Sequence, residues 1–159
     1  QEIDAGVSKM TYVHCAWPYR AQGVTAAQMN LAFGLAVMAL DGSAFVDQYV
    51  EERLAEPRVL AMVAKVKAHI DPDIESGGPP MRHASTVRVV TRNGASHTVR
   101  TDNRKGSPED PLTLEDLQRK FHAIIKPTPI AARAGDIVDA VDRIDRSPNV
   151  VSLLKLLVV

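Results

Sequence analysis

The sequence is poor in the residues that build several common kinds of functional site. Its 159 residues include one cysteine, Cys15. This count excludes a disulfide within the chain and a zinc or iron–sulfur centre built from cysteines. Aromatic residues make up 4%, too few for the stacking platforms of proteins that bind single-stranded nucleic acid. Lys and Arg number 19, as do Asp and Glu, so the basic surplus that nucleic-acid binding needs is missing.

Long apolar runs are also missing. The longest stretches, residues 31–40 and 150–159, are too short or too interrupted to cross a membrane, and no signal peptide is visible. We therefore expect a cytoplasmic setting and no membrane or nucleic-acid partner. The chain begins with Gln1, which leaves open that the native start is missing or that the chain is a piece of a longer protein.

The N-terminal part predicts a strand and then a long helix. Apolar and polar residues alternate over residues 2–14, which favours an extended segment. Thr25 followed by Gln28 forms a capping box, and most later positions to residue 40 are apolar. Such a helix is buried on all sides. Gly42 is expected to end it.

The middle of the chain predicts shorter elements. Ser43 is expected to cap a helix that runs to residue 54, and Pro57 to begin another. Alternation over residues 66–70 predicts a strand. Residues 85–101 predict a hairpin, because the Asn-Gly pair at 93–94 favours a two-residue type I′ turn.

The C-terminal part is expected to be helical. Thr113 caps a helix with Asp116 at its third position, a second helix covers residues 130–144, and a last short helix follows Ser147. The whole order predicts an α+β fold, in which helices cover a small, mostly antiparallel sheet.

Other residues suggest chemistry only weakly. The histidines form no metal-binding pair, and an inert, buried thiol is favoured over a nucleophile at Cys15. The Lys105-Gly106 pair lacks the glycine spacing of a phosphate loop. A group of arginines near the hairpin forms either a basic stripe or, as we favour, a solvated sheet face. The histidines are His14, His69, His83, His97 and His122. The arginines near the hairpin are Arg82, Arg88, Arg92, Arg100 and Arg104.

Five segments together carry a family resemblance. Residues 24–33 and 40–42 are similar to a helix of pattern A-Q-x-S-x-x-Y…L-x-D-G, and residues 56–66 to D-P-x-V…K-V. Residues 87–94 match a strand and turn, and residues 105–113 are similar to K-G-x-P-x-N-P-L-T. In this order they resemble the C-terminal half of the MmgE/PrpD family, which includes 2-methylcitrate dehydratases, cis-aconitate decarboxylases and iminodisuccinate epimerases.

The resemblance implies a longer enzyme with two domains, one all-helical and one smaller, lid-like α/β domain. Residues 1–112 would be the lid-like domain. Residues 113–159 would be helices that pack on a helical domain absent from this chain. The family acts on small polycarboxylates without metal or organic cofactor, and its acid–base side chains remove a proton next to a carboxylate.

The resemblance also marks site residues. It places most catalytic groups before Gln1, and the family's tyrosine and serine at Phe33 and Asn30. Phe33 keeps the ring but lacks the hydroxyl, so it cannot donate a proton. Ordinary core packing is its alternative role. The residues expected to bind substrate are Tyr19, Arg20, Gln28 and Asn30.

Two functions remain open from the sequence. One is the C-terminal portion of a metal-independent lyase or isomerase, incomplete by itself, in which Arg20 grips a substrate carboxylate. Arg20 is alternatively a surface-loop arginine. The other function is a truncated or diverged, non-catalytic interaction module. Apolar residues at 25–40 and 150–159 predict a homodimer or a complex with a helical partner domain.

Overall fold

The computed structural model describes residues 2–158. Their contacts form two compact units, one ending at Asp110 and the other beginning at Pro111. The first unit holds a sheet with its helices, and the second is helical, so the predicted α+β class is confirmed. Among the helices at positions 2–158, none has the length and apolar character that crossing a membrane requires.

Four strands build the sheet in the order β2-β1-β3-β4. They are β1 (Glu2–Val7), β2 (Val66–Ile70), β3 (Ser85–Val90) and β4 (Ser96–Thr101). β1 pairs with β2 in parallel, whereas the β1–β3 and β3–β4 pairs are antiparallel. The sheet is therefore mostly antiparallel, as predicted, and the predicted strand at 66–70 is confirmed.

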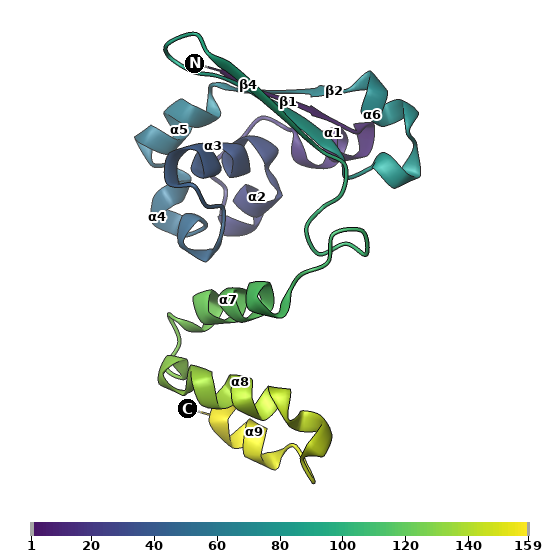
Figure 1. Cartoon of the computed structure of the whole chain (residues 1–159). Helices are drawn as coiled ribbons and strands as arrows, with labels where there is room; N and C mark the ends of the chain where they lie inside the picture. The colour runs from purple at the N-terminus through teal and green to yellow at the C-terminus, as the bar shows by residue number, and fades with distance from the viewer. Residues whose placement is uncertain (1, 159) are drawn as a thin grey trace. The chain divides into compact units, whose positions relative to one another are not determined.

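The helices α2 to α5 gather on one face of the sheet (Figure 1). Ile3 of β1 packs there against Ala36 and Met62, and the inward-facing Val87 and Val89 of β3 join this cluster. Helices of the first unit are α1 (Lys9–Cys15), α2 (Val24–Met29), α3 (Leu31–Asp41), α4 (Glu51–Leu54), α5 (Pro57–Val63) and α6 (Pro72–Ser76), with 3-10 turns η1 (Val46–Gln48) and η2 (Pro79–Met81).

The predicted extended segment at 2–14 is wrong in its second half. β1 ends at Val7, and α1 follows. Ser8 begins this helix, since its hydroxyl accepts a hydrogen bond from the Thr11 backbone N–H at 3.2 Å. This local cap satisfies a donor that a strand would have paired elsewhere, and it outweighs the alternating pattern.

The predicted helix over residues 25–40 is two helices that meet at Asn30. Asn30 has an extended backbone (φ −97°, ψ 118°), and its side chain caps α3 by accepting from the Phe33 N–H at 3.0 Å. The predicted cap at Thr25 is wrong, because Gly23 precedes α2. An internal Asn favours a new cap over continued helix since its side chain competes for backbone donors.

Two further predictions about α3 have different outcomes. Gly42 ends the helix in the left-handed conformation (φ 70°), as predicted. The prediction that this helix is buried on all sides is wrong. Phe33, Ala36 and Val37 are buried, whereas Met38 is 48% exposed. The helix therefore buries one face.

The predicted helix capped by Ser43 is also wrong. η1 starts after Phe45, whose N–H donates to the Gln48 side chain at 3.1 Å, and α4 starts after Val50. Pro57 does begin α5, as predicted, because its missing N–H costs nothing at a first helical position.

The predicted hairpin is confirmed, but its turn has three residues rather than two. Gly94 has φ +85°, and no other type of residue at 2–158 has a positive φ, which excludes a type I′ turn. Gly94 N–H donates to the Thr91 carbonyl at 3.1 Å, and Thr91 N–H donates to the Ala95 carbonyl at 2.9 Å. Asn93 instead uses its side-chain oxygen to accept from the Ala95 N–H at 3.2 Å.

The second unit has its own small core of Ile125, Ala134 and Ile137. The Thr113–Asp116 capping box at its first helix is confirmed. The helix predicted over residues 130–144 is shorter than expected, and a 3-10 turn lies at each end of it. The elements are α7 (Leu114–Ile125), η3 (Ala131–Arg133), α8 (Ala134–Asp142), η4 (Ile144–Arg146) and α9 (Val151–Leu157).

Candidate functional site

A concavity of about 230 Å³ opens in the segment between α1 and α2. It is lined by Trp17, Pro18, Arg20, Gln22 and Ala26. An indole and a proline ring provide apolar walls, while a guanidinium and an amide provide hydrogen-bond donors. Such a mixture suits a small molecule with a carboxylate, because the planar guanidinium forms two parallel hydrogen bonds to the two carboxylate oxygens.

Asn30 fixes one end of this segment. Its Nδ2 donates to the Trp17 carbonyl at 2.8 Å, while its Oδ1 accepts from the Phe33 N–H at 3.0 Å. Asn30 is 2% exposed; its bond to Phe33 is buried, and its bond to Trp17 is partly buried. The Asn30 side chain therefore positions the backbone of the concavity, and its predicted contact with substrate stays a prediction.

Tyr19 fixes the middle of the segment. Its hydroxyl donates to the Leu54 carbonyl at 2.9 Å, and its ring centroid lies 5.0 Å from that of Phe33. Burial, and secondarily the negative charge of Glu51, raise the pKa of Tyr19 above its ordinary value. The phenol therefore stays protonated at neutral pH and keeps this anchoring hydrogen bond.

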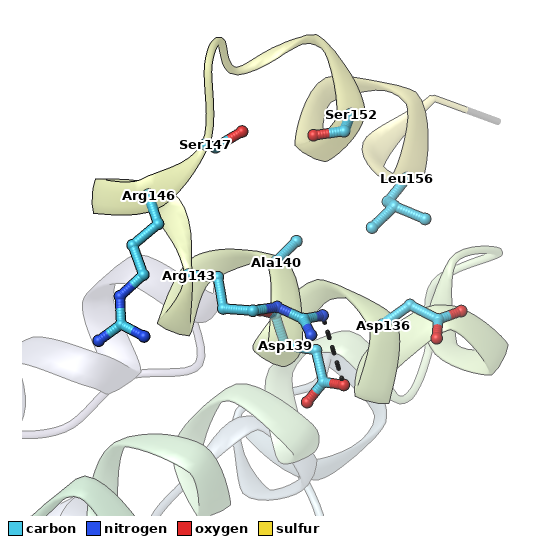
Figure 2. Close-up of a pocket in the computed structure, with 8 residues that line it drawn as sticks. All are labelled: Asp136, Asp139, Ala140, Arg143, Arg146, Ser147, Ser152 and Leu156. Carbon is cyan, nitrogen blue, oxygen red and sulfur yellow. Dashed lines mark hydrogen bonds and ion pairs between the residues drawn. The ribbon is translucent and has the colours of Figure 1, made fainter.

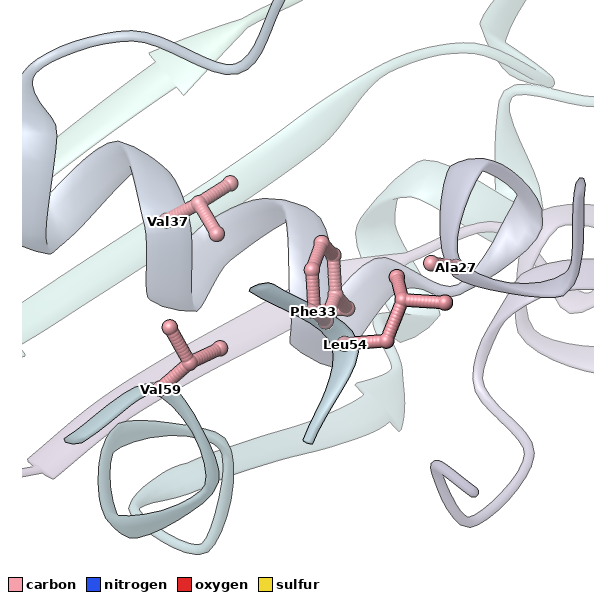
Figure 3. Close-up of a cluster of buried hydrophobic side chains, with 5 residues drawn as sticks. All are labelled: Ala27, Phe33, Val37, Leu54 and Val59. Atoms are coloured by element: carbon pink, nitrogen blue, oxygen red, sulfur yellow. The ribbon is translucent and has the colours of Figure 1, made fainter. Parts of the chain in front are cut away.

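Phe33 lies at the centre of a closed hydrophobic core (Figure 3). It has no exposed surface, and its ring centroid lies 5.5 Å from that of Tyr49. Burial also raises the pKa of Tyr49. The residues drawn around this ring are Ala27, Phe33, Val37, Leu54 and Val59.

The structure thus distributes the five predicted site residues over different places. Arg20 lines the concavity, and Tyr19 and Asn30 hold the segment that carries it. Gln28 is exposed on α2, and Phe33 is in the core. Sequence reasoning did not select the wall residues Trp17 and Gln22 individually. A lone tryptophan followed by proline just before a helix was the available signal.

A second concavity, of about 440 Å³, lies in the C-terminal unit (Figure 2). The guanidinium of Arg143 points toward Asp139, at 3.7 Å, and its Nε donates to the Asp139 carbonyl. Its charged residues are two acids and two arginines, and Arg143 and Asp139 already form an ion pair within the lining, so little net attraction remains for an ion of either sign. Its residues are Asp136, Asp139, Ala140, Arg143, Arg146, Ser147, Ser152 and Leu156.

A metal-binding cluster or an activated thiol would be a further kind of candidate site. Within residues 2–158, no three His, Cys, Asp or Glu residues come together as a metal site. Cys15 is partly buried, and burial raises the pKa of its thiol, which lowers the thiolate fraction.

Comparison with known proteins gives one consistent result. The family model of the MmgE/PrpD C-terminal domain matches residues 1–145. A cis-aconitate decarboxylase from Aspergillus terreus is 26% identical over 99% of this chain and 32% of its own length. The Mus musculus and Homo sapiens cis-aconitate decarboxylases are 31% and 29% identical over 53% and 61% of this chain.

The chain spans about a third of the length of the Aspergillus relatives that it matches. The matched model nevertheless covers most of the chain, including the Trp17–Arg20 concavity and the whole sheet. The chain therefore belongs to the MmgE/PrpD family, and what it represents of that family is the C-terminal domain.

Proposed function

We propose that the chain serves as the C-terminal part of a metal-independent lyase or isomerase that acts on small polycarboxylates. One observation carries this proposal. Arg20 is exposed and lines a concavity that has both apolar walls and hydrogen-bond donors, in a C-terminal domain of the MmgE/PrpD family. The relatives named above are cis-aconitate decarboxylases, and their substrate is a small polycarboxylate of the class that Arg20 suits.

The role of this chain in that reaction is to bind and orient. Arg20 holds one carboxylate in a bidentate contact, and Trp17 shields the bound molecule from water. Removal of a proton next to a carboxylate moves negative charge onto that carboxylate as an enediolate forms. A guanidinium fixed at that carboxylate stabilises the developing charge.

We place the groups that exchange protons with the substrate on a helical partner domain, in the same protein or in a separate chain. The helices α7 to α9 are proposed to pack on that domain. No organic cofactor takes part in this scheme, since proton removal by side chains is sufficient chemistry.

The test combines the chain with the helical part of the Aspergillus terreus decarboxylase, by co-expression. Loss of cis-aconitate and exchange of carbon-bound protons of citrate in D₂O are followed by NMR. We expect turnover in the combined preparation. Arg20→Gln should lower kcat/KM by about a hundredfold, because the variant loses two charge-assisted hydrogen bonds to the substrate carboxylate.

The matched control is Arg58→Gln, which removes an exposed arginine on α5. It should leave kcat/KM unchanged, and Arg20→Lys should restore only part of the activity, because an ammonium lacks the fork geometry. Equal activity of the Arg20→Gln variant and the parent contradicts the role of Arg20. No turnover of either acid in the combined or the isolated preparation contradicts the lyase or isomerase.

Exposed apolar residues favour a second function, that of an association module. Met29 and Met38 are about half exposed in the first unit, and α9 exposes several side chains in the second. We propose a homodimer or a complex with a helical partner. Sedimentation should show a species larger than a monomer, and a monomer at high concentration contradicts this. The exposed residues around α9 are Val150, Val151, Leu154, Leu157 and Val158.

A further inference from the structure

A concavity of about 550 Å³ lies where η2 and the segment after β4 meet, within the first unit. Three of the residues that line it carry or can carry positive charge, namely Arg82, His83 and Arg104. Two come from the loop before β3 and one from the turn after β4, so the fold brings together residues that are 21 and 22 positions apart in the sequence. It shares no lining residue with the Trp17 concavity.

The three basic groups are close enough to affect one another. Arg82 Nε donates to His83 Nε2 at 3.0 Å, so the neutral imidazole carries its proton on Nδ1. Partial desolvation lowers the pKa of His83, and the charges of Arg104 and Arg82 lower it further. Positive charges held together in this way repel one another unless an anion lies among them.

The acids of the concavity are already engaged. Asp102 Oδ1 accepts from Arg100 Nε at 2.7 Å. The pKa of Glu109 is lowered mainly by hydrogen bonds to its own backbone and to Ser107, and least by Arg104. Within residues 2–158 the Arg104 guanidinium forms no hydrogen bond or ion pair, so it can contact a ligand, and the nearby Glu109 carboxylate is the competing anion.

The backbone that carries the two arginines is fixed on both sides. The Arg82 carbonyl accepts from the Ser8 hydroxyl at 2.7 Å and from the Thr11 hydroxyl at 3.0 Å. The Arg104 carbonyl accepts from the Ser107 N–H at 3.0 Å, and Ser107 is 7% exposed. The backbone that carries the cluster is thus held in place before a ligand arrives, which reduces the entropy lost on binding.

We propose that Arg82, His83 and Arg104 form a binding site for a small multivalent oxyanion, a phosphate or a polycarboxylate. Both ligand types present several oxygens to guanidinium forks and to an imidazole N–H. Because the three side chains are exposed to water, binding is expected at millimolar concentrations and to be weakened by salt.

The test is a titration of the full chain with sodium phosphate and, separately, with citrate, at constant ionic strength near neutral pH. The His83 ring is followed by NMR, and the His83→Gln variant assigns its signal. We expect a saturable shift of that signal and a higher His83 pKa in the bound state. The anion that binds more tightly identifies phosphate or carboxylate as the preferred group.

The variants Arg104→Gln and Arg82→Gln should weaken binding at least tenfold, whereas Arg58→Gln should leave it unchanged. Circular dichroism checks that each variant is folded. An identical shift with sodium chloride alone overturns the proposal, because it shows a general salt effect. Unchanged affinity in both arginine variants overturns it as well.

Discussion

The side chain of Asn30 holds the backbone of Trp17, through a 2.8 Å hydrogen bond from Nδ2 to the Trp17 carbonyl. The same side chain caps α3 through Phe33. One buried amide therefore links the helix that fills the core to the segment that forms the Trp17 concavity. Stability of the core and geometry of the concavity depend on the same residue.

Asn30→Ala should lower the free energy of unfolding by about 1–3 kcal/mol, since it removes a helix cap, leaves the buried Phe33 N–H without its partner and releases the Trp17 carbonyl. Urea unfolding followed by the fluorescence of Trp17, the one tryptophan of the chain, measures the change. Asn30→Ser keeps a capping oxygen but does not reach Trp17, and should lie between parent and Asn30→Ala. An Asn30→Ala midpoint equal to that of the parent would refute the link.

Phe33→Tyr should destabilise the chain by about 1–3 kcal/mol. The ring has no exposed surface, and its neighbours Tyr19 and Tyr49 already fill the space around it. An added hydroxyl must displace them and find a hydrogen-bond partner inside the core. Phe33→Leu provides the comparison, because it loses volume without adding a polar atom. A rise in the urea midpoint of Phe33→Tyr would show that a partner for the hydroxyl exists.

Gly94→Ala should destabilise the hairpin by about 1 kcal/mol, because Gly94 has φ +85° and an L side chain is strained there. No atom lies within 4 Å of the added Cβ, so backbone strain is the only expected cost. Gly94→Asn should cost less, since Asn tolerates the left-handed region better. Equal thermal midpoints for parent, Gly94→Ala and Gly94→Asn would argue against the three-residue turn.

Alkaline pH should destabilise the first unit. Burial raises the pKa of Tyr19 and of Tyr49 in the folded chain, so the folded state keeps protons that the unfolded state releases near pH 10. Stability is then full below about pH 10 and falls as pH rises toward the folded values. Urea midpoints across that range measure the loss, and the double variant Tyr19→Phe, Tyr49→Phe should show a smaller loss. An equal loss in the double variant would assign it to other groups.

Local chemistry determined much of the fold from the sequence alone. The strand at residues 66–70, the helix start at Pro57, the end of α3 at Gly42 and the Thr113 capping box each depend on neighbours within a few positions. Where two local signals competed, the prediction from the sequence was wrong. At Ser8 the helix cap outweighed the alternation of apolar and polar residues that favours a strand.

Only the tertiary structure decided what the candidate site residues do. Arg20, Tyr19, Asn30 and Phe33 lie within fifteen positions of one another, yet one lines a concavity, two hold its backbone and one fills the core. Their partners, such as the Leu54 carbonyl, are distant in the sequence. A role that depends on such a partner exists only once the chain has folded, because the helix-forming pattern at residues 24–41 carries no record of what packs against it.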